Sequence, residues 1–183
     1  ILAECRSAVA DGYRQITLLG QNVNSYGHDL DLKIDFPDLL YHVGTLDGLV
    51  RLRFTTSHPK DCSRKLLETM AHIGSVCEHL HLPVQAGDDE VLRRMGRGYT
   101  AGHFKAIVSQ ARELMPNLSV TTDVMVGFPG ETPEQFENTL ALFEELRFDQ
   151  AFMFKYNDRP GTAASDMSDK IAEDEKQRRL GKL

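Results

Sequence analysis

SVTTDVMVGFPGET, residues Ser119–Thr132, joins an apolar strand, a glycine-rich turn and the start of a helix. The β-branched residues of 120–126 favour a strand that is buried on both faces. The two glycines of Gly127–Gly130 allow the backbone to turn sharply and to approach another group closely. Thr132 is a suitable helix N-cap, with Pro133 at the first helical position. A strand that ends at such a turn, beside a helix N-terminus, predicts a ligand-binding position in an α/β protein.

Length and composition indicate a soluble globular protein with one substantial core. The chain has 183 residues, of which 41% are hydrophobic and 26% charged, and these values are ordinary for a soluble domain. The net charge of −6 provides no overall electrostatic attraction to nucleic acid. The sequence shows neither an apolar run of membrane length nor a signal peptide, so we expect no membrane partner.

The three cysteines, Cys5, Cys62 and Cys77, are too scattered for a CxxC-type site and cannot all pair within one chain. We expect incidental free thiols, which fit a reducing, cytoplasmic location. The chain begins at Ile1, inside a stretch that reads as helix. We therefore interpret it as a fragment of a longer protein.

Hydrophobic periodicity and turn residues predict strict alternation of helices and strands along the chain. The expected helices are Ile1–Ala10, Phe36–Val43, Ser63–His72, Asp88–Met95, Thr100–Met115, Pro133–Leu146 and the charged tail from Ser168. The expected strands are Gln15–Leu19, Leu49–Thr56, His79–Gln85, the strand before Gly127, and Phe148–Tyr156, with a loose polar segment at Asn24–Asp35. Such alternation implies right-handed parallel crossovers, hence an open doubly wound sheet or a barrel.

Three of these strands alternate between a polar-bearing face and an apolar face. The polar-bearing positions are Arg51, Arg53, Thr55 and Ser57, then His79, His81, Pro83 and Gln85, then Thr121, Asp123 and Gly127; Leu52, Phe54 and Thr56 are among the apolar ones. If helices cover the apolar faces, the polar faces line the interior of a barrel. Arg53, His81 and Asp123 could then pair there, because buried charges need partners. The alternative is ordinary alternation against solvent.

Each expected strand ends in residues that are common in binding sites. These ends are Gly20-Gln21-Asn22, Ser57-His58-Pro59, Gln85-Ala86-Gly87, Gly127-Phe128-Pro129-Gly130 and Tyr156-Asn157. Active sites of barrels collect at the carboxyl ends of the strands. The five ends together therefore predict a site there, although turns use the same residue types.

Two further groups of residues have competing interpretations. His79 and His81 share one strand face, as metal ligands do in some barrel hydrolases, but no acidic or histidine cluster follows at metal-ligand spacing, which favours structural histidines. Arg93, Arg94 and Arg97 form the dense basic patch of the sequence. Arginines of this kind either clamp a carboxylate or phosphate or form a solvated helix face.

Six segments resemble the radical S-adenosylmethionine methylthiotransferases, and most closely the MiaB-type tRNA methylthiotransferases. They are LLGQNVNSYG (18–27), RLRFTTSHPKD (51–61), HLHLPVQAG (79–87), MGRGYT (95–100), TTDVMVGFPGET (121–132) and FDQAFMFKYNDRPGTAA (148–164). The likeness runs nearly from end to end. GQNVNSYG and FTTSHPKD favour the tRNA branch over the branch that acts on ribosomal protein S12.

The resemblance implies an α/β fold, a partial (β/α)6 TIM-like barrel truncated at its N-terminus, with about five parallel strands present. It implies S-adenosylmethionine bound beside a [4Fe-4S] cluster, which together yield a 5′-deoxyadenosyl radical. The implied reaction is radical methylthiolation of tRNA, which converts N6-isopentenyladenosine at position 37 to its 2-methylthio derivative. The family's N-terminal domain carries a second cluster.

One departure from the family pattern concerns the cluster ligands. The family's C-x3-C-x2-C motif does not match Cys5, Cys62 or Cys77, so we expect no metal ligand here and the cluster cysteines upstream of Ile1. Residues 1–166 would form the radical SAM core without its first strand. Residues 167–183 would lead toward an absent C-terminal TRAM domain, and the fragment alone would be inactive.

The resemblance also places cofactor-binding residues at the strand ends. Gly20 and Gln21 match the position that meets the methionine amino group. Ser57 and Gln85 match positions for the cofactor's polar groups or ribose. Arg97 matches the basic residue that meets the carboxylate.

The remaining implied positions lie around the glycine turn. Gly127, Phe128 and Gly130 should shape an adenine slot, with Tyr156 nearby, and Asp123 should act from the barrel interior. No residue is assigned as catalytic.

The implied partners are the anticodon loop of tRNA, at A37, and an electron donor such as flavodoxin or ferredoxin. The fragment alone should bind tRNA weakly if the affinity lies mainly in the TRAM domain. Three alternatives stay open: a sister enzyme for threonylcarbamoyladenosine in tRNA or for ribosomal protein S12, a metal-dependent TIM-barrel hydrolase using His79, His81 and Asp123, and a non-catalytic interaction module.

Overall fold

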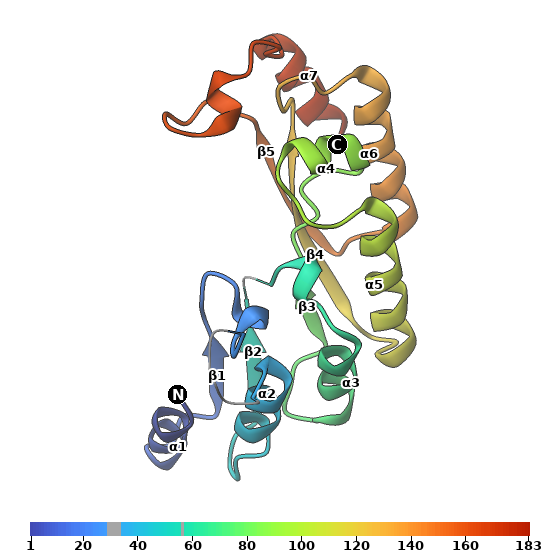
Figure 1. Ribbon diagram of the computed structural model, residues 1–183. Helices are drawn as coiled ribbons and strands as arrows, with labels where there is room; N and C mark the ends of the chain where they lie inside the picture. The colour runs from blue at the N-terminus through green and yellow to red at the C-terminus, as the bar shows by residue number, and fades with distance from the viewer. Residues whose placement is uncertain (29–33, 56) are drawn as a thin grey trace. The chain divides into compact units, whose positions relative to one another are not determined.

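The computed structural model describes residues 1–28, 34–55 and 57–183 of the chain (Figure 1). The chain divides into two compact units. Unit 1 comprises residues 1–82 and 107–120, and unit 2 comprises residues 83–106 and 121–183.

Helices and strands alternate as the sequence predicts. The helices are α1 (Leu2–Ala10), α2 (Phe36–Gly44), α3 (Arg64–His72), α4 (Asp89–Arg94), α5 (Ala101–Leu114), α6 (Pro133–Leu146) and α7 (Glu173–Lys182). The strands are β1 (Gln15–Leu18), β2 (Arg51–Phe54), β3 (His79–His81), β4 (Ser119–Val126) and β5 (Gln150–Lys155). Short 3-10 turns occur at η1 (Val23–Ser25), η2 (Pro59–Asp61) and η3 (Ala163–Asp166).

Four described strands end before the predicted residue. β1 ends at Leu18 rather than at Leu19, and β5 ends at Lys155 rather than at Tyr156. β3 ends at His81 rather than at Gln85, and β2 ends at Phe54. Thr56, which was predicted to end that second strand on its apolar face, lies outside the described residues, as does part of the predicted polar segment at 24–35.

Unit 1 is built on a parallel pair of strands. β1 pairs with β2 in a register that runs from Gln15 opposite Arg51 to Leu18 opposite Phe54. Leu52 continues the parallel pairing by a bridge to Val76, and the Ser119 N–H donates to the Glu78 carbonyl at 3.0 Å. The apolar residues beneath this pair are fully buried, among them Phe36, Leu40, Leu52 and Leu66.

Unit 2 is built on a second parallel pair. β4 pairs with β5 in a register that runs from Thr121 opposite Gln150 to Val126 opposite Lys155. Gln85 forms a parallel bridge to Val124 on the other edge of β4. Figure 1 shows α7 at the end of this unit toward which β4 and β5 both run. The parallel strands confirm the predicted α/β class, and they form two sheets rather than a closed barrel.

Local capping explains where several helices begin. Asp35 and Asp38 form a reciprocal capping box at the start of α2, and Thr132 and Gln135 form another at the start of α6. Asp88 caps α4 by accepting hydrogen bonds from two backbone N–H groups. These caps satisfy N–H groups that a helix start leaves unpaired. The prediction that Thr132 caps α6 is therefore confirmed.

The predicted alternation of faces also holds. Leu52 and Phe54 of β2 are buried while Arg51 is exposed and Arg53 is half-buried. On β4, Val120, Thr122, Val124 and Val126 are all inaccessible to solvent, whereas Asp123 is half-buried. The pairing of Arg53, His81 and Asp123 stays a prediction. Within the described residues, no helix is both long and apolar enough to cross a lipid bilayer.

Candidate functional site

The predicted site residues divide between the two units. Gly20, Gln21 and Ser57 belong to unit 1, and the other seven belong to unit 2. The two sets are therefore described separately, and their roles stay predictions.

In unit 1 the loop after β1 borders a cavity of about 760 Å³. Gly20, Gln21 and Asn22 line it together with apolar side chains such as Leu18 and Leu39. A mostly apolar concavity with a few polar groups at one edge is the usual form of a small-molecule site. The two predicted residues Gly20 and Gln21 thus lie at a cavity of suitable character.

A polar cluster fixes this loop against the loop after β2. The Asp61 carboxylate accepts hydrogen bonds from Asn22 Nδ2 at 2.8 Å and from Ser25 Oγ at 2.6 Å. Burial alone would raise the pKa of Asp61, but the bonds from Ser25 and Asn22 outweigh it and hold that pKa below its usual value. Asn24 and His58 exchange two further bonds, Asn24 Nδ2 to the His58 carbonyl at 3.0 Å and His58 N–H to Asn24 Oδ1 at 2.9 Å.

This cluster was missed by reasoning from the sequence. Asn22 and Asp61 are separated by 39 positions, so no local pattern joins them. The sequence did indicate that the loops after β1 and β2, which carry Asn22 and Asp61, would meet at one edge of a sheet. Asn22 Oδ1 is buried and finds no hydrogen-bond partner within residues 1–28, 34–55 and 57–183, which leaves one acceptor for a ligand.

Ser57 is the third predicted residue of unit 1. Its side chain is buried, and its Oγ has no hydrogen-bond partner in the described part of the chain. A buried hydroxyl without a partner costs free energy, so such a group is expected to meet a ligand or a water molecule. Ser57 therefore fits the role of a contact to a polar group of a cofactor.

In unit 2, Gln85 has a backbone conformation that non-glycine residues rarely adopt. Its φ is +67°, in the left-handed region. Two backbone hydrogen bonds hold it, from Gln85 N–H to the Asp123 carbonyl at 2.8 Å and from Met125 N–H to the Gln85 carbonyl at 2.9 Å. Strain of this kind costs on the order of 1–3 kcal/mol and is concentrated at functional sites. The sequence did not indicate it.

The predicted basic patch has three members with different surroundings. Arg93 is exposed and pairs with Glu90 at 2.5 Å, which makes it part of a solvated helix face. Arg94 pairs with Asp169 at 2.6 Å. Arg97 has a buried Nε without a partner among the residues described. Of the three, Arg97 is the one with a buried N–H that finds no partner among the described residues, and an arginine N–H is a suitable donor to a carboxylate.

The glycine turn after β4 is closed by its own residues. Gly127 and Gly130 have φ values of +72° and +75°, which glycine adopts without strain. Gly127 N–H donates to Glu131 Oε2 at 2.7 Å. The rings of Phe128 and Tyr156 meet edge to face with centroids 5.4 Å apart. The structure thus brings together the four predicted residues of the adenine slot.

Side chains of the protein occupy the positions that a Cβ atom would take at Gly127 and at Gly130. A Cβ on Gly127 would collide with the Lys176 side chain, and one on Gly130 with the Arg94 guanidinium and the Asp169 carboxylate. The predicted ligand-binding turn is therefore partly covered by Arg94 and by Asp169 and Lys176 of the C-terminal segment.

The cysteines do not fit a cluster site. Cys5 and Cys62 are buried, and burial raises the pKa of Cys62 to about 12. Throughout residues 1–28, 34–55 and 57–183, no three His, Cys, Asp or Glu side chains are grouped so that they could hold a metal ion.

Comparison with known proteins identifies the family. The model of the radical SAM superfamily matches residues 1–143. The chain belongs to the radical SAM superfamily. This confirms the resemblance noted from the strand-end segments.

Curated relatives of this radical SAM chain share one name. The proteins called tRNA-2-methylthio-N(6)-dimethylallyladenosine synthase from Desulfitobacterium hafniense and Carboxydothermus hydrogenoformans are 54% and 52% identical to it over 183 residues. The matches cover 100% of this chain but only 41% and 42% of those proteins. The chain thus spans about two-fifths of the length of these relatives.

Solved structures support the fold. The coproporphyrinogen III oxidase HemN of Escherichia coli, a radical SAM enzyme, superposes with a TM-score of 0.69 at 21% identity, covering 99% of this chain and 43% of that one. Streptococcus suis SuiB, solved with S-adenosylmethionine, gives 0.59 at 15% identity, covering 99% and 36%. At these identities the likeness concerns the fold alone. The predicted fold class is confirmed.

Proposed function

We propose that this chain is the radical SAM core of a tRNA methylthiotransferase that converts N6-isopentenyladenosine at position 37 to its 2-methylthio derivative. One observation carries the proposal: the whole chain is 54% identical to a protein named tRNA-2-methylthio-N(6)-dimethylallyladenosine synthase. The likeness includes the strand-end segments on which the family resemblance rests. A sister enzyme for threonylcarbamoyladenosine or for ribosomal protein S12 is the alternative outcome of the substrate test.

We propose S-adenosylmethionine as the cofactor of these residues. In unit 1, Gly20 and Gln21 line the cavity, which supports a contact to the methionine amino group. Ser57 Oγ finds no hydrogen-bond partner in the part of the chain that the structure describes, which supports a contact to another polar group of the cofactor. In unit 2, the partnerless Arg97 Nε supports a contact to the carboxylate. These buried polar atoms need partners, and the cofactor offers groups of the matching chemistry.

The adenine is proposed to lie against the turn 127–130, with Phe128 and Tyr156 as its apolar wall. Gln85 forms a parallel bridge to Val124 of β4, and its N–H donates to the carbonyl of the neighbouring Asp123 at 2.8 Å. We propose that Gln85 contacts the ribose or another polar group of the cofactor, and that Asp123 acts from the polar-bearing face of the strand. When bound beside a reduced [4Fe-4S] cluster, S-adenosylmethionine supplies the one-electron chemistry. The role of this chain is to orient the cofactor and exclude water from it.

We further propose that the cluster ligands come from sequence before Ile1. Cys5, Cys62 and Cys77 do not fit that role, and the chain spans 41% of its relative from Desulfitobacterium hafniense. We propose 1–166 as the radical SAM core and 167–183 as the segment toward an RNA-binding TRAM domain. The proposed partners are the tRNA anticodon loop and a flavodoxin or ferredoxin, in the cytoplasm.

Cofactor binding can be measured in the longest natural chain that contains these residues, with its cluster reconstituted. We expect Gln85→Ala, Ser57→Ala and Arg97→Ala each to weaken the binding of S-adenosylmethionine, measured by isothermal titration, by about tenfold. Arg93→Ala is the matched control, because Arg93 is exposed and pairs with Glu90. Unchanged affinity in Gln85→Ala and Arg97→Ala would show that the residues are wrongly assigned.

The substrate needs a separate measurement. Nucleosides from the tRNA of a deletion strain, with and without the cloned gene, can be analysed by mass spectrometry. We expect 2-methylthio-N6-isopentenyladenosine to disappear on deletion and to return on complementation. Loss of a different methylthio group would assign the chain to a sister enzyme instead.

A further inference from the structure

A buried ion pair connects α7 to the glycine turn of unit 2. Arg179 Nη1 donates to Glu131 Oε2 at 2.6 Å and to the Glu131 carbonyl at 2.9 Å. Both residues are 2% exposed. Arg179 Nε also donates to Glu175 Oε1 at 2.8 Å, and its guanidinium lies 5.5 Å from the centre of the Phe136 ring. The orientation of Arg179 is therefore fixed by several contacts at once.

The same carboxylate oxygen reaches the first residue of the turn. Glu131 Oε2 accepts the Gly127 N–H at 2.7 Å, and Glu131 N–H donates to the Phe128 carbonyl at 3.0 Å. Glu131 thus closes 127–131 into a ring of hydrogen bonds, and Arg179 holds the carboxylate that closes it. Burial raises the pKa of Glu131, while Gly127 N–H and Arg179 oppose that rise.

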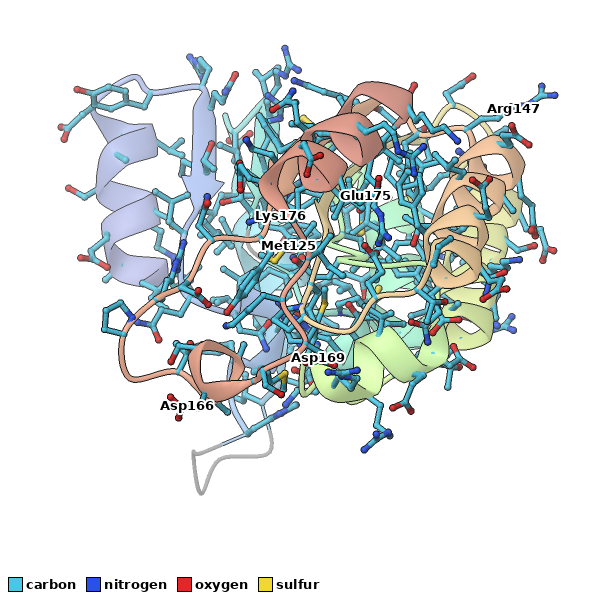
Figure 2. All side chains as sticks on the ribbon, turned by 90° about the horizontal axis from the view of Figure 1, so that it is seen from above. Met125, Arg147, Asp166, Asp169, Glu175 and Lys176 are labelled. Atoms are coloured by element: carbon cyan, nitrogen blue, oxygen red, sulfur yellow. The ribbon has the colours of Figure 1, made fainter. Side chains whose placement is uncertain are left out.

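The segment before α7 holds the other end of the turn. Gly130 N–H donates to the Asp169 carbonyl at 2.7 Å, and Lys176 Nζ donates to the Tyr156 carbonyl at 3.0 Å. Figure 2 shows Asp169, Glu175 and Lys176 along this C-terminal segment. The backbone at both predicted walls of the slot, the turn and Tyr156, is therefore tied to residues 166–182.

Energetics favour a positioning role over a stabilising one. Bringing two charges out of water costs several kcal/mol per ion, and a hydrophobic pair of similar volume is often as stable. A buried pair is better explained where it fixes a geometry that matters. Glu131 Oε1 is in addition buried without a hydrogen-bond partner among the described residues.

We propose that Arg179 is a positioning residue for the cofactor site: through Glu131 it sets the backbone of Gly127–Gly130 against which adenine binds. The inference rests on the function proposed above. It makes α7 a part of the cofactor site rather than only a connection to a following domain. Residues of α7 and of the segment before it contact one side of the turn, and the adenine is proposed to bind on the side of Phe128 and Tyr156.

The test compares two neighbouring arginines. Arg178 and Arg179 both pair with Glu175, but Arg178 is half exposed and has no contact with Glu131 in the described structure. In the longest natural chain, with its cluster reconstituted, Arg179→Met should weaken S-adenosylmethionine binding by about tenfold or more at unchanged stoichiometry in isothermal titration. Arg178→Met should bind as the wild type does. An affinity within twofold of wild type in Arg179→Met would overturn the proposal.

A second variant separates positioning from simple stability. Glu131→Gln with Arg179→Met removes both charges, so no unpaired charge stays buried and folding should be retained. We expect its melting temperature to lie near that of the wild type while its cofactor affinity stays weakened. If affinity returns together with the melting temperature, the pair is only structural and the proposal is wrong. If the wild-type chain binds no S-adenosylmethionine, the proposed function itself has failed.

Discussion

Gly87 and Thr139 lie in a contact that leaves no room for a side chain at position 87. The Gly87 N–H donates to Thr139 Oγ1 at 2.9 Å, and a Cβ on Gly87 would lie 2.5 Å from the Thr139 Cα. Thr139 is buried on α6, so the helix backbone cannot move away without loss of packing. This contact fixes the segment that follows the strained Gln85 against α6.

Replacement of Gly87 by alanine should therefore destabilise the protein by about 1–3 kcal/mol, because the added methyl group overpacks a backbone contact. Urea denaturation followed by circular dichroism measures the change. Gly102→Ala is the control. Gly102 belongs to α5, and the nearest atom to its new Cβ, outside its chain neighbours and the helix backbone, would be Thr100 Oγ1, at 3.9 Å. That change should be neutral or mildly stabilising. Equal effects of the two changes would contradict the packing argument.

The cysteines should differ in reactivity. Cys62 is buried and its pKa is raised to about 12, and burial likewise raises the pKa of Cys5. Because the thiolate is the reactive form, both should be alkylated slowly in the native protein. Cys77 is only half-buried and should react first. Peptide mapping by mass spectrometry after a brief iodoacetamide treatment ranks the three, and full reaction in denaturant is the control.

The end of α6 offers a stabilising substitution. Arg147 caps this helix in the left-handed region, with φ +47°. Glycine adopts that conformation without the steric cost that other residues incur, so Arg147→Gly should stabilise the protein by about 0.5–1 kcal/mol. Arg147→Ala removes the same side chain but keeps the strain, and should bring no gain. Thermal unfolding of the three proteins decides, and a gain shared by both variants would refute the conformational argument. Figure 2 marks Arg147.

The elements of this fold that could be predicted from sequence are those with local causes. α6 begins at Pro133 because the side chains of Thr132 and Gln135 each accept a hydrogen bond from the other residue's backbone N–H. Both residues lie within a few positions of the helix start. The strand before Gly127 has fully buried alternate positions, as the predicted alternation of its two faces indicated. Its other face is only half-buried at Asp123 and Met125, so the expectation that both faces are buried was wrong. Such signals need no knowledge of distant contacts.

The parts that could not be predicted depend on residues far apart in the chain. Glu131 and Arg179 are separated by 48 positions, and the charged composition of the tail does not show which arginine is buried. Gln85 was expected as the last residue of a regular strand, but it has a φ of +67° and is held by backbone hydrogen bonds to Asp123 and Met125. The resemblance to a family, rather than residue chemistry, supplied the cofactor-binding positions.

Acid should loosen α7. Glu173 accepts from Lys155 and from Lys176, and Glu175 accepts from Arg178 and Arg179. These bonds lower the pKa of Glu173 and of Glu175 from 4.5 to about 2. The unfolded chain therefore binds protons more tightly at these two positions than the folded chain does. Their contribution to stability is complete above pH 4.5 and is lost as the pH falls toward 2.

Glu131 contributes with the opposite sign, because burial raises its pKa and the folded state then holds its proton more tightly. We thus expect the melting temperature to fall between pH 4.5 and 2, and to fall less steeply in Glu173→Gln with Glu175→Gln. Calorimetry at a series of pH values measures the two slopes. At about 1 M salt the Debye length is near 3 Å, so the difference between the proteins should shrink, since both glutamates are solvent-accessible. Of these ion pairs only Lys155–Glu173 joins α7 to another element, and the others lie within the helix. Parallel slopes for wild type and variant at low salt would mean that the four pairs do not stabilise the folded state.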